Sequence, residues 1–241
     1  MDREKMSYGW AGTILRIDLS SRKISKVPLN DDLKNKYLGG RGINVRLLYD
    51  EVKPGTIGLD PDNVLIFGTG PITGTMTASG RLTITAICPE TNMLGDTNGG
   101  SHFSPEVKYA GYDHIVVTGK SEEPVYVWIN NDDVEIRDAR HLWGKMTDET
   151  QEILKKELGD RHVQVTCIGP AGENLVNIAG VAIGADGFGG KFGMGAVMGS
   201  KKLKALVVRG TGGVKVADPE GFKAWAKDVM LSTLIHNYGY V

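Results

Sequence analysis

The chain passes twice through the same order of sequence features. Each half opens with two short runs of alternating apolar and polar residues, separated by a polar turn, at 13–27 and at 125–136. This pattern predicts a β-hairpin. A helical segment follows in each half, and then an apolar strand that ends in Gly-Pro. The ranges are 31–38 and 147–158 for the helices, and 64–71 and 163–170 for the strands.

The remainder of each half repeats as well. A further strand is predicted at 82–87 and at 176–181, and a closing strand at 115–119 and at 206–210. Between them lies a glycine pair that we expect to open a helix, Gly99-Gly100 in one half and Gly189-Gly190 in the other. Shared features in one order indicate an internal duplication. The expected fold class is α+β, with two similar β-sheets and packed helices related by a pseudo-twofold axis.

The duplication also predicts the domain boundaries. We expect one duplicated domain over residues 1–216, with copies at about 8–119 and 120–216. Asp218-Pro219 then has the form of an N-cap followed by a proline in the first helical turn. Apolar residues at helical spacing follow, namely Phe222, Trp225, Val229 and Met230. Residues 217–241 are therefore predicted to start a following helical domain, which is incomplete in this chain.

Glycine is unusually abundant, with 33 glycines in 241 residues, about twice the typical share of roughly 7%. The glycines cluster around 39–42, 68–74, 95–100 and 184–199. Because glycine lets a backbone approach a ligand closely, these separate clusters favour several loops that converge on one bulky ligand. A turn-rich fold without a ligand is the alternative.

The two predicted helix starts favour anion binding. Free N–H groups and the positive end of a helix dipole attract phosphate, and glycine allows it to approach. Two such sites related by pseudo-symmetry predict a ligand with two phosphates. Arg81 follows a glycine at the start of a strand, where its guanidinium group can reach an anion. An ordinary surface arginine is the alternative interpretation.

Charge and cysteine content exclude other classes of protein. A formal net charge of -1 gives no basic field for a nucleic acid or an anionic membrane, and no apolar run approaches the roughly 20 residues that span a bilayer. The first residues lack an apolar signal core, which favours a cytoplasmic location. Cys88 and Cys167 form no CxxC pair. The residues alone thus predict a cradle for a phosphorylated ligand and reveal no catalytic group.

Several longer segments are more specific. They are Tyr8-Gly9-Trp10-Ala11-Gly12, Leu38-Gly39-Gly40-Arg41-Gly42, Gly70-Pro71-Ile72-Thr73-Gly74-Thr75, Ser79-Gly80-Arg81, Tyr109-Ala110-Gly111-Tyr112-Asp113, Ile168-Gly169-Pro170-Ala171-Gly172-Glu173-Asn174-Leu175 and Gly195-Ala196-Val197-Met198-Gly199-Ser200-Lys201. In this order, over about residues 7–216, they resemble the amino-terminal domain of the tungsten-containing aldehyde ferredoxin oxidoreductase family.

The resemblance implies a cofactor and the residues that contact it. In that family the domain is a saddle under a tungsten bis-pterin (tungstopterin), whose two phosphates share a magnesium ion. By resemblance, Arg81 and Asn98 contact the phosphates and magnesium, and Gly100 makes a backbone contact. The contact of the second copy falls at Gly187 and Phe188, with the Phe188 carbonyl and Asn98 holding the magnesium. Family members often have arginine at the positions of Gly187 and Lys191. Gly187 therefore lacks a positive fork, and Lys191 keeps the charge but not the bidentate geometry.

The resemblance also implies an activity. Family members oxidise aldehydes to carboxylates and pass the electrons through a [4Fe–4S] cluster to ferredoxin. The cluster ligands lie in later domains, and this chain has no cysteine after Cys167. We therefore expect the chain alone to be inactive and to work with the remaining domains of the same enzyme, with a homodimer left open. The alternatives are the equivalent domain of a benzoyl-coenzyme A reductase type of tungsten enzyme, or a non-catalytic, stand-alone pterin-binding or scaffold module.

Overall fold

The computed structural model describes residues 8–76 and 79–238, and its strands form two six-stranded sheets. The first half of the chain supplies β1 (Thr13–Asp18), β2 (Lys23–Pro28), β3 (Leu65–Gly68), β4 (Arg81–Ile87), β5 (Leu94–Gly100) and β6 (His114–Thr118). The second half supplies β7 (Val125–Asn130), β8 (Asp133–Asp138), β9 (Gln164–Cys167), β10 (Val181–Ile183), β11 (Gly187–Gly189) and β12 (Leu203–Arg209). The helices are α1 (Asp31–Tyr37), α2 (Arg41–Glu51), α3 (Phe103–Tyr109), α4 (Thr147–Leu158), α5 (Pro170–Glu173), α6 (Met194–Ser200) and α7 (Pro219–Tyr238), with a 3₁₀ turn at Arg140–Leu142.

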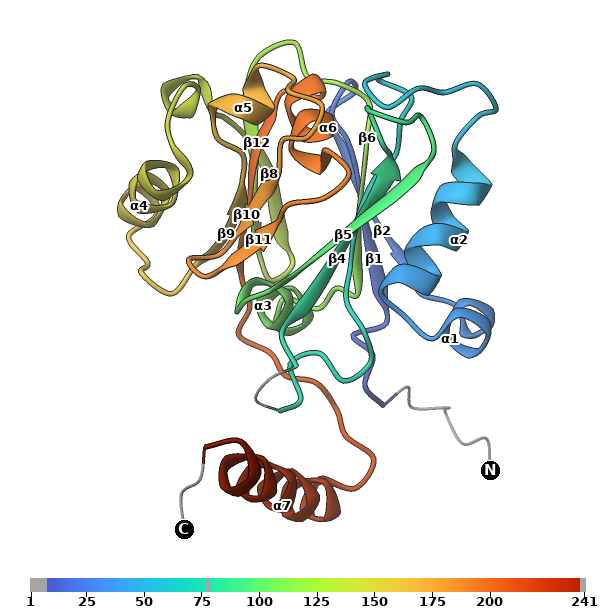
Figure 1. Ribbon diagram of the computed structural model, residues 1–241, viewed down its shortest axis with the longest axis vertical. Coiled ribbons are helices and arrows are strands. Elements are labelled where there is room, and N and C mark those ends of the chain that lie inside the picture. The colour runs from blue at the N-terminus through green and yellow to red at the C-terminus, as the bar shows by residue number, and fades with distance from the viewer. Residues whose placement is uncertain (1–7, 77–78, 239–241) are drawn as a thin grey trace.

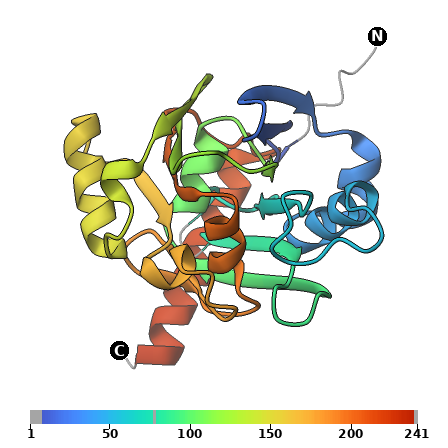
Figure 2. The same cartoon turned by 90° about the horizontal axis from the view of Figure 1, so that it is seen from above.

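The two sheets have the same strand order. The first reads β2-β1-β6-β3-β4-β5, and the second, taken from the corresponding edge, reads β8-β7-β12-β9-β10-β11. The pairs β1–β6 and β7–β12 are parallel, and the other neighbouring strands are antiparallel. The two halves lie side by side (Figures 1 and 2). The predicted α+β fold and its duplication are confirmed.

The strand registers match residue by residue between the halves. Thr83 on β4 and Ala182 on β10 are equivalent positions of the two halves. Each of them pairs with the residue that lies two positions before the Gly-Pro sequence of its own half. Thr83 pairs with Asn98 on β5, and Ala182 pairs with Phe188 on β11. Asn98 and Phe188, which the sequence links only through a resemblance, are therefore equivalent positions of the duplication.

The main core lies between the two sheets. Alternate residues of both sheets point into it, among them Leu15, Leu82, Val127 and Ile183. The other face of the first sheet packs against α2, and the other face of the second sheet packs against α4. Central strands are thus covered on both faces, which explains why they are apolar runs in the sequence.

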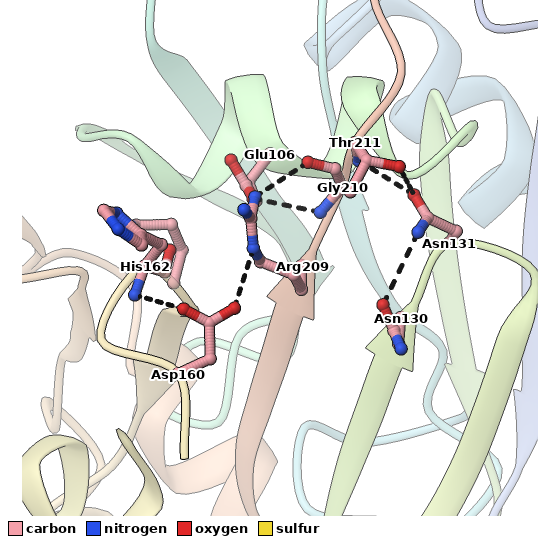
Figure 3. A network of polar contacts seen from close by, with 9 residues as sticks. Glu106, Asn130, Asn131, Asp160, His162, Arg209, Gly210 and Thr211 are labelled. Atoms are coloured by element: carbon pink, nitrogen blue, oxygen red, sulfur yellow. Dashed lines mark hydrogen bonds and ion pairs between the residues drawn. The ribbon is translucent and has the colours of Figure 1, made fainter. Parts of the chain in front are cut away.

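Helices α3 and α6 join the two halves. Although α3 belongs to the first half, it packs on β9 and β12 of the second sheet, whereas α6 of the second half contacts β4 of the first sheet. Arg209 at the end of β12 secures α3, since its guanidinium group bonds Glu106 on α3 and Asp160 before β9, both at 2.8 Å (Figure 3). The two copies therefore share one core and exchange helices across it.

A buried ion pair fixes the segment that leads into β1. The Asp113 carboxylate accepts hydrogen bonds from Ala11 N at 3.0 Å and Gly12 N at 2.6 Å, and it pairs with Lys108 Nζ. Both charged side chains are fully buried. Burial lowers the pKa of Lys108, while the neighbouring Asp113 carboxylate opposes that shift. These hydrogen bonds hold residues 9–12 against the start of β6.

The glycine pairs do not open helices, which corrects the sequence prediction. Gly99-Gly100 ends β5, and Gly189 ends β11. Helix α3 begins only at Phe103 and α6 only at Met194. The backbone N–H groups of the glycines are therefore strand groups rather than groups of a helix N-terminus. The glycine-rich β5 is held extended by its ladder with β4 and not by its own propensity.

Two other segments differ from the prediction. The predicted strand at 176–181 is wrong, because Ala179 O accepts from Gly195 N of α6 at 2.9 Å and the strand β10 starts only at Val181. Helix α2 was missed, since Gly40-Arg41-Gly42 looks like a break in a helical pattern. Gly40 has a φ of 48°, which turns the chain between α1 and α2, and a left-handed backbone of this kind favours glycine.

Helix α7 starts as predicted and lies away from the two sheets (Figure 1). Asp218 Oδ1 accepts a hydrogen bond from Gly221 N at 3.0 Å, and Pro219 is the first helical residue. None of residues 219–232 is buried, and Trp225 is 53% exposed. Across the described ranges, 8–76 and 79–238, no helix is long and apolar enough to span a membrane.

Candidate cofactor-binding site

The edge strands β5 and β11 face each other, and we call the line between them the seam. The backbones come very close there. A Cβ atom at Gly187 would lie 2.4 Å from Gly100 O, and one at Gly99 would lie 2.5 Å from Ile183 Cδ1. Only glycine allows this approach. Two of the glycine clusters, around 95–100 and 184–199, thus lie together in the fold, and they meet as strand edges rather than as helix starts.

The strand geometry decides where the backbone groups of β5 point. Ser101 N donates to Gly80 O at 2.9 Å, so these two residues form a hydrogen-bonded pair. Bonded and non-bonded pairs alternate along an antiparallel ladder. Gly100, opposite Arg81, and Asn98, opposite Thr83, are therefore in non-bonded pairs. Their N–H and C=O groups point away from β4 and into the seam.

The same reasoning applies to β11. Gly184 N donates to Val165 O at 2.8 Å, so Gly184 and, two residues earlier, Ala182 direct their backbone groups toward β9. Phe188 opposes Ala182 on the far side of β10 and so turns its own N–H and C=O away from β10. The carbonyls of Asn98 and Phe188 therefore enter the seam from its two sides, at equivalent positions of the duplication.

Arg81 and Gly100 lie side by side next to open space. They are paired in register, and both line a cavity of about 540 Å³. Both are exposed, and Arg81 makes no hydrogen bond or ion pair with the residues that the structure describes. The nearest atom to a Cβ built on Gly100 is Gly80 O at 4.0 Å. An arginine without a partner beside an uncovered strand backbone suits an anionic ligand.

The side chain of Asn98 is already hydrogen-bonded within the protein. Its Oδ1 accepts from Thr83 Oγ1 at 2.8 Å, and its Nδ2 donates to Asp96 Oδ2 at 2.9 Å. Asp96 Oδ2 also accepts from Arg41 Nε, at 2.8 Å. The sequence reasoning missed Asp96 as a partner of Asn98 and Arg41 as a partner of Asp96, because only the strand β5 and the start of α2 bring them together. Asn98 thus keeps its backbone groups, rather than its side-chain amide, available for a ligand.

The second copy presents different groups. Gly187 is buried and has no side chain to offer, and Lys191 is exposed, with its backbone N–H bonded to Thr97 Oγ1 at 3.2 Å. Phe188 is 62% exposed. Within the described residues there is no group of three His, Cys, Asp or Glu side chains that could hold a metal ion. The oxygen atoms that the seam offers to a metal include the backbone carbonyls of Asn98 and Phe188.

The fold and the seam define a duplicated domain whose two copies meet at the facing edge strands β5 and β11. The family model described as "Aldehyde ferredoxin oxidoreductase, N-terminal domain" matches residues 14–210. The chain belongs to this family.

Named relatives agree with this assignment. The tungsten-containing aldehyde ferredoxin oxidoreductase of Pyrococcus horikoshii is 46% identical over 216 residues, which is 89% of this chain and 36% of that protein. The enzyme of the same name from Pyrococcus furiosus is 43% identical, again over 36% of its length. Another Pyrococcus furiosus protein, "Aliphatic sulfonate oxidoreductase, WOR-like subunit", is 35% identical over 38% of its length. This chain thus spans little more than a third of these relatives.

A solved structure shows the same fold. It is the active-site complex BamBC of benzoyl coenzyme A reductase with 1,5-dienoyl-CoA. The TM-score is 0.93 at 43% sequence identity, and the match covers 98% of this chain and 36% of that one. The duplicated arrangement is therefore shared by enzymes whose names indicate different substrates.

Proposed function

We propose that this domain binds a tungsten bis-pterin cofactor along the seam. The observation that carries the proposal is the pair of equivalent strand edges, at Asn98 and Phe188, that turn their backbone groups toward each other. A ligand with two similar halves matches such a duplicated surface. The names of several relatives include tungsten, which supports a tungsten cofactor.

The residues at the seam fit such a cofactor. Arg81 and the outward N–H groups of Asn98 and Gly100 would bind phosphate oxygens through charged hydrogen bonds. The carbonyls of Asn98 and Phe188 suit a magnesium ion, which prefers oxygen ligands and commonly binds together with phosphates. When bound, the tungsten pterin supplies the redox chemistry. In this proposal the residues of this chain bind the cofactor and orient it.

The parent activity that we propose is the oxidation of an aldehyde to a carboxylate, with electrons passing through a [4Fe–4S] cluster to ferredoxin. Because the chain spans 36% of its aldehyde ferredoxin oxidoreductase relatives, the substrate pocket, the cluster and the ferredoxin contact belong in this proposal to other domains of the same enzyme. This chain by itself would then be inactive. A benzoyl-coenzyme A reductase type of activity is the second candidate, favoured by the TM-score of 0.93 to that enzyme's active-site complex.

Substitution at the seam tests the binding role. In the full-length enzyme that contains this domain, Arg81→Ala removes a charged hydrogen bond, so we expect weaker cofactor retention by about 1.5–3 kcal/mol. Gly100→Asp places bulk and negative charge in the space above β5 and should abolish retention. Tungsten and pterin content per protein are the measurements.

A matched control is Arg140→Ala, because Arg140 is an exposed arginine that pairs with Asp138 on a different part of the surface. It should keep the full tungsten content. If Arg81→Ala and Gly100→Asp also keep it, the binding role proposed for the seam is wrong.

A further inference from the structure

The two halves of the cradle are not alike. Arg81 is two residues before Thr83, and the matching registers place Gly180 at the corresponding position of the second copy. In the same way Gly190 corresponds to Gly100. The first copy therefore has an exposed arginine beside an exposed glycine, whereas the second copy has two glycines and no cation at these positions.

The ring of Phe188 occupies that second surface. A Cβ atom at Gly180 would lie 2.5 Å from the ring's Cζ, and one at Gly190 would lie 3.2 Å from its Cε1. The ring can rest there only because both positions lack a side chain. Two glycines thus form a seat for one aromatic ring, on the surface where the first copy holds its arginine.

The Phe188 ring packs on the two glycines but is not buried. Phe188 remains 62% exposed, so one side of the ring rests on glycine backbone while much of the rest meets solvent. An exposed ring in a fixed position offers a large, rigid contact surface at low entropic cost. It attracts flat aromatic groups rather than anions.

We propose that the Phe188 ring is a stacking platform for a planar heterocycle, namely the pterin of the cofactor half that the second copy holds. This inference rests on the proposed function and deepens it. The first copy binds its half through charge, at Arg81, and the second copy binds its half through ring contact, at Phe188. Phe188 is thereby a specificity-determining residue with two separate roles, because its carbonyl faces the seam while its ring lies on Gly180 and Gly190.

The ring contact is tested with a free pterin as the probe. Titration of this chain with 6-hydroxymethylpterin, followed by pterin fluorescence, should show binding that Phe188→Ala weakens roughly tenfold, as expected for the loss of one stacked ring. Phe188→Tyr keeps an aromatic ring and should retain affinity. Phe192→Ala is the matched control, since Phe192 is also an exposed phenylalanine, 44% exposed, but packs over Gly95.

A second variant separates stacking from a folding defect. Among the described residues, and apart from its neighbours along the chain, a Cβ atom at Gly190 meets only the Phe188 ring within 4 Å. Gly190→Ala should therefore shift the ring with little other change. It should weaken pterin binding in the parent chain and have no further effect in the Phe188→Ala background. An equal effect of Gly190→Ala on pterin binding in both backgrounds would overturn the proposed stacking role of Phe188. Unchanged or tighter binding by Phe188→Ala would overturn it too, and tighter binding would mean that the ring blocks the site.

The full-length enzyme distinguishes this inference from the proposed function. Tungsten content should fall in Phe188→Ala and be retained in Phe188→Tyr. Loss in Arg81→Ala and Gly100→Asp together with full retention in Phe188→Ala would defeat the platform alone. Full retention in Arg81→Ala and Gly100→Asp would defeat the proposed cofactor site, whereas the titration with free pterin would still decide the role of the ring.

Discussion

A few buried polar side chains fix α2 to the strand β4, next to the seam. Asn44, in the first turns of α2, donates from Nδ2 to Thr83 O at 3.1 Å and to Thr85 Oγ1 at 3.0 Å. Its Oδ1 lies 2.8 Å from His114 Nδ1, which therefore carries the proton. Burial lowers the pKa of His114 to about 4. These contacts fix α2 to the strand that carries Arg81.

His114 should make stability depend on pH. Its pKa is about 4 in the folded chain and near 6.5 when unfolded, so the unfolded chain binds the proton more readily. The free energy of unfolding should therefore be highest above pH 6.5. It should fall by about 3 kcal/mol in total as the pH drops toward 4. Urea unfolding across this range should show the loss in the parent chain. His114→Gln, which can still donate to Asn44, should show a shallower pH dependence, and equal slopes would contradict the assignment.

The sequence identifies some site residues and not their partners. Arg81 and Gly100 could be proposed because an arginine after a glycine and a glycine cluster are visible in one dimension. The role of Asp96 could not, because its contact with Asn98 exists only once β5 is extended. The seat of Phe188 depends on Gly180, which looks like any other loop glycine until the registers are known. Whether the five residues proposed from sequence contact a cofactor stays a prediction.

Elements with strong periodicity were predictable, and those fixed by their neighbours were not. The hairpins at 13–27 and 125–136 and the helix at 147–158 follow from alternation, turn residues and helical spacing. Strand β5, with the sequence Leu-Gly-Asp-Thr-Asn-Gly-Gly, has few residues that favour strands, and its ladder with β4 holds it extended. Gly40 similarly hides the start of α2, because glycine normally interrupts a helix.

Helix α7 should be the least protected helix of this chain. Its apolar residues Trp225 and Leu231 are 53% and 49% exposed, and most of the stability of a helix in a protein comes from the packing of its apolar face. Hydrogen exchange at residues 222–232 should therefore be fast, while α4, whose Leu154 is fully buried, should exchange slowly in the same sample. Slow exchange of α7 in a proven monomer would show that it packs more firmly than its exposure indicates.

At the scale of the whole molecule, the two copies of the duplication form one folding unit. Helix α3 packs on the second sheet, α6 contacts the first sheet, and both sheets share one core. Each half alone would leave the inner face of its sheet uncovered. The boundary predicted between residues 119 and 120 thus separates two copies in sequence without separating two domains in space.

Splitting the chain at that boundary tests this view. Fragments 8–119 and 120–216 should each lack cooperative thermal unfolding when expressed alone, because each loses the apolar surface of its partner. Mixed or co-expressed, they should associate into one particle with a single transition. Sharp unfolding of either fragment by itself would show that the copies remain independent.

The facing strand edges of β5 and β11 have a consequence for the life of the protein in the cell. In the described part of the chain, neither edge is paired with a further strand, but the two edges lie so close to each other that a foreign strand has little room to add to either. Each copy therefore shields the edge strand of the other from edge-to-edge aggregation, and a bulky substitution at Gly99 or Gly187 that parts the two strands would expose both edges at once.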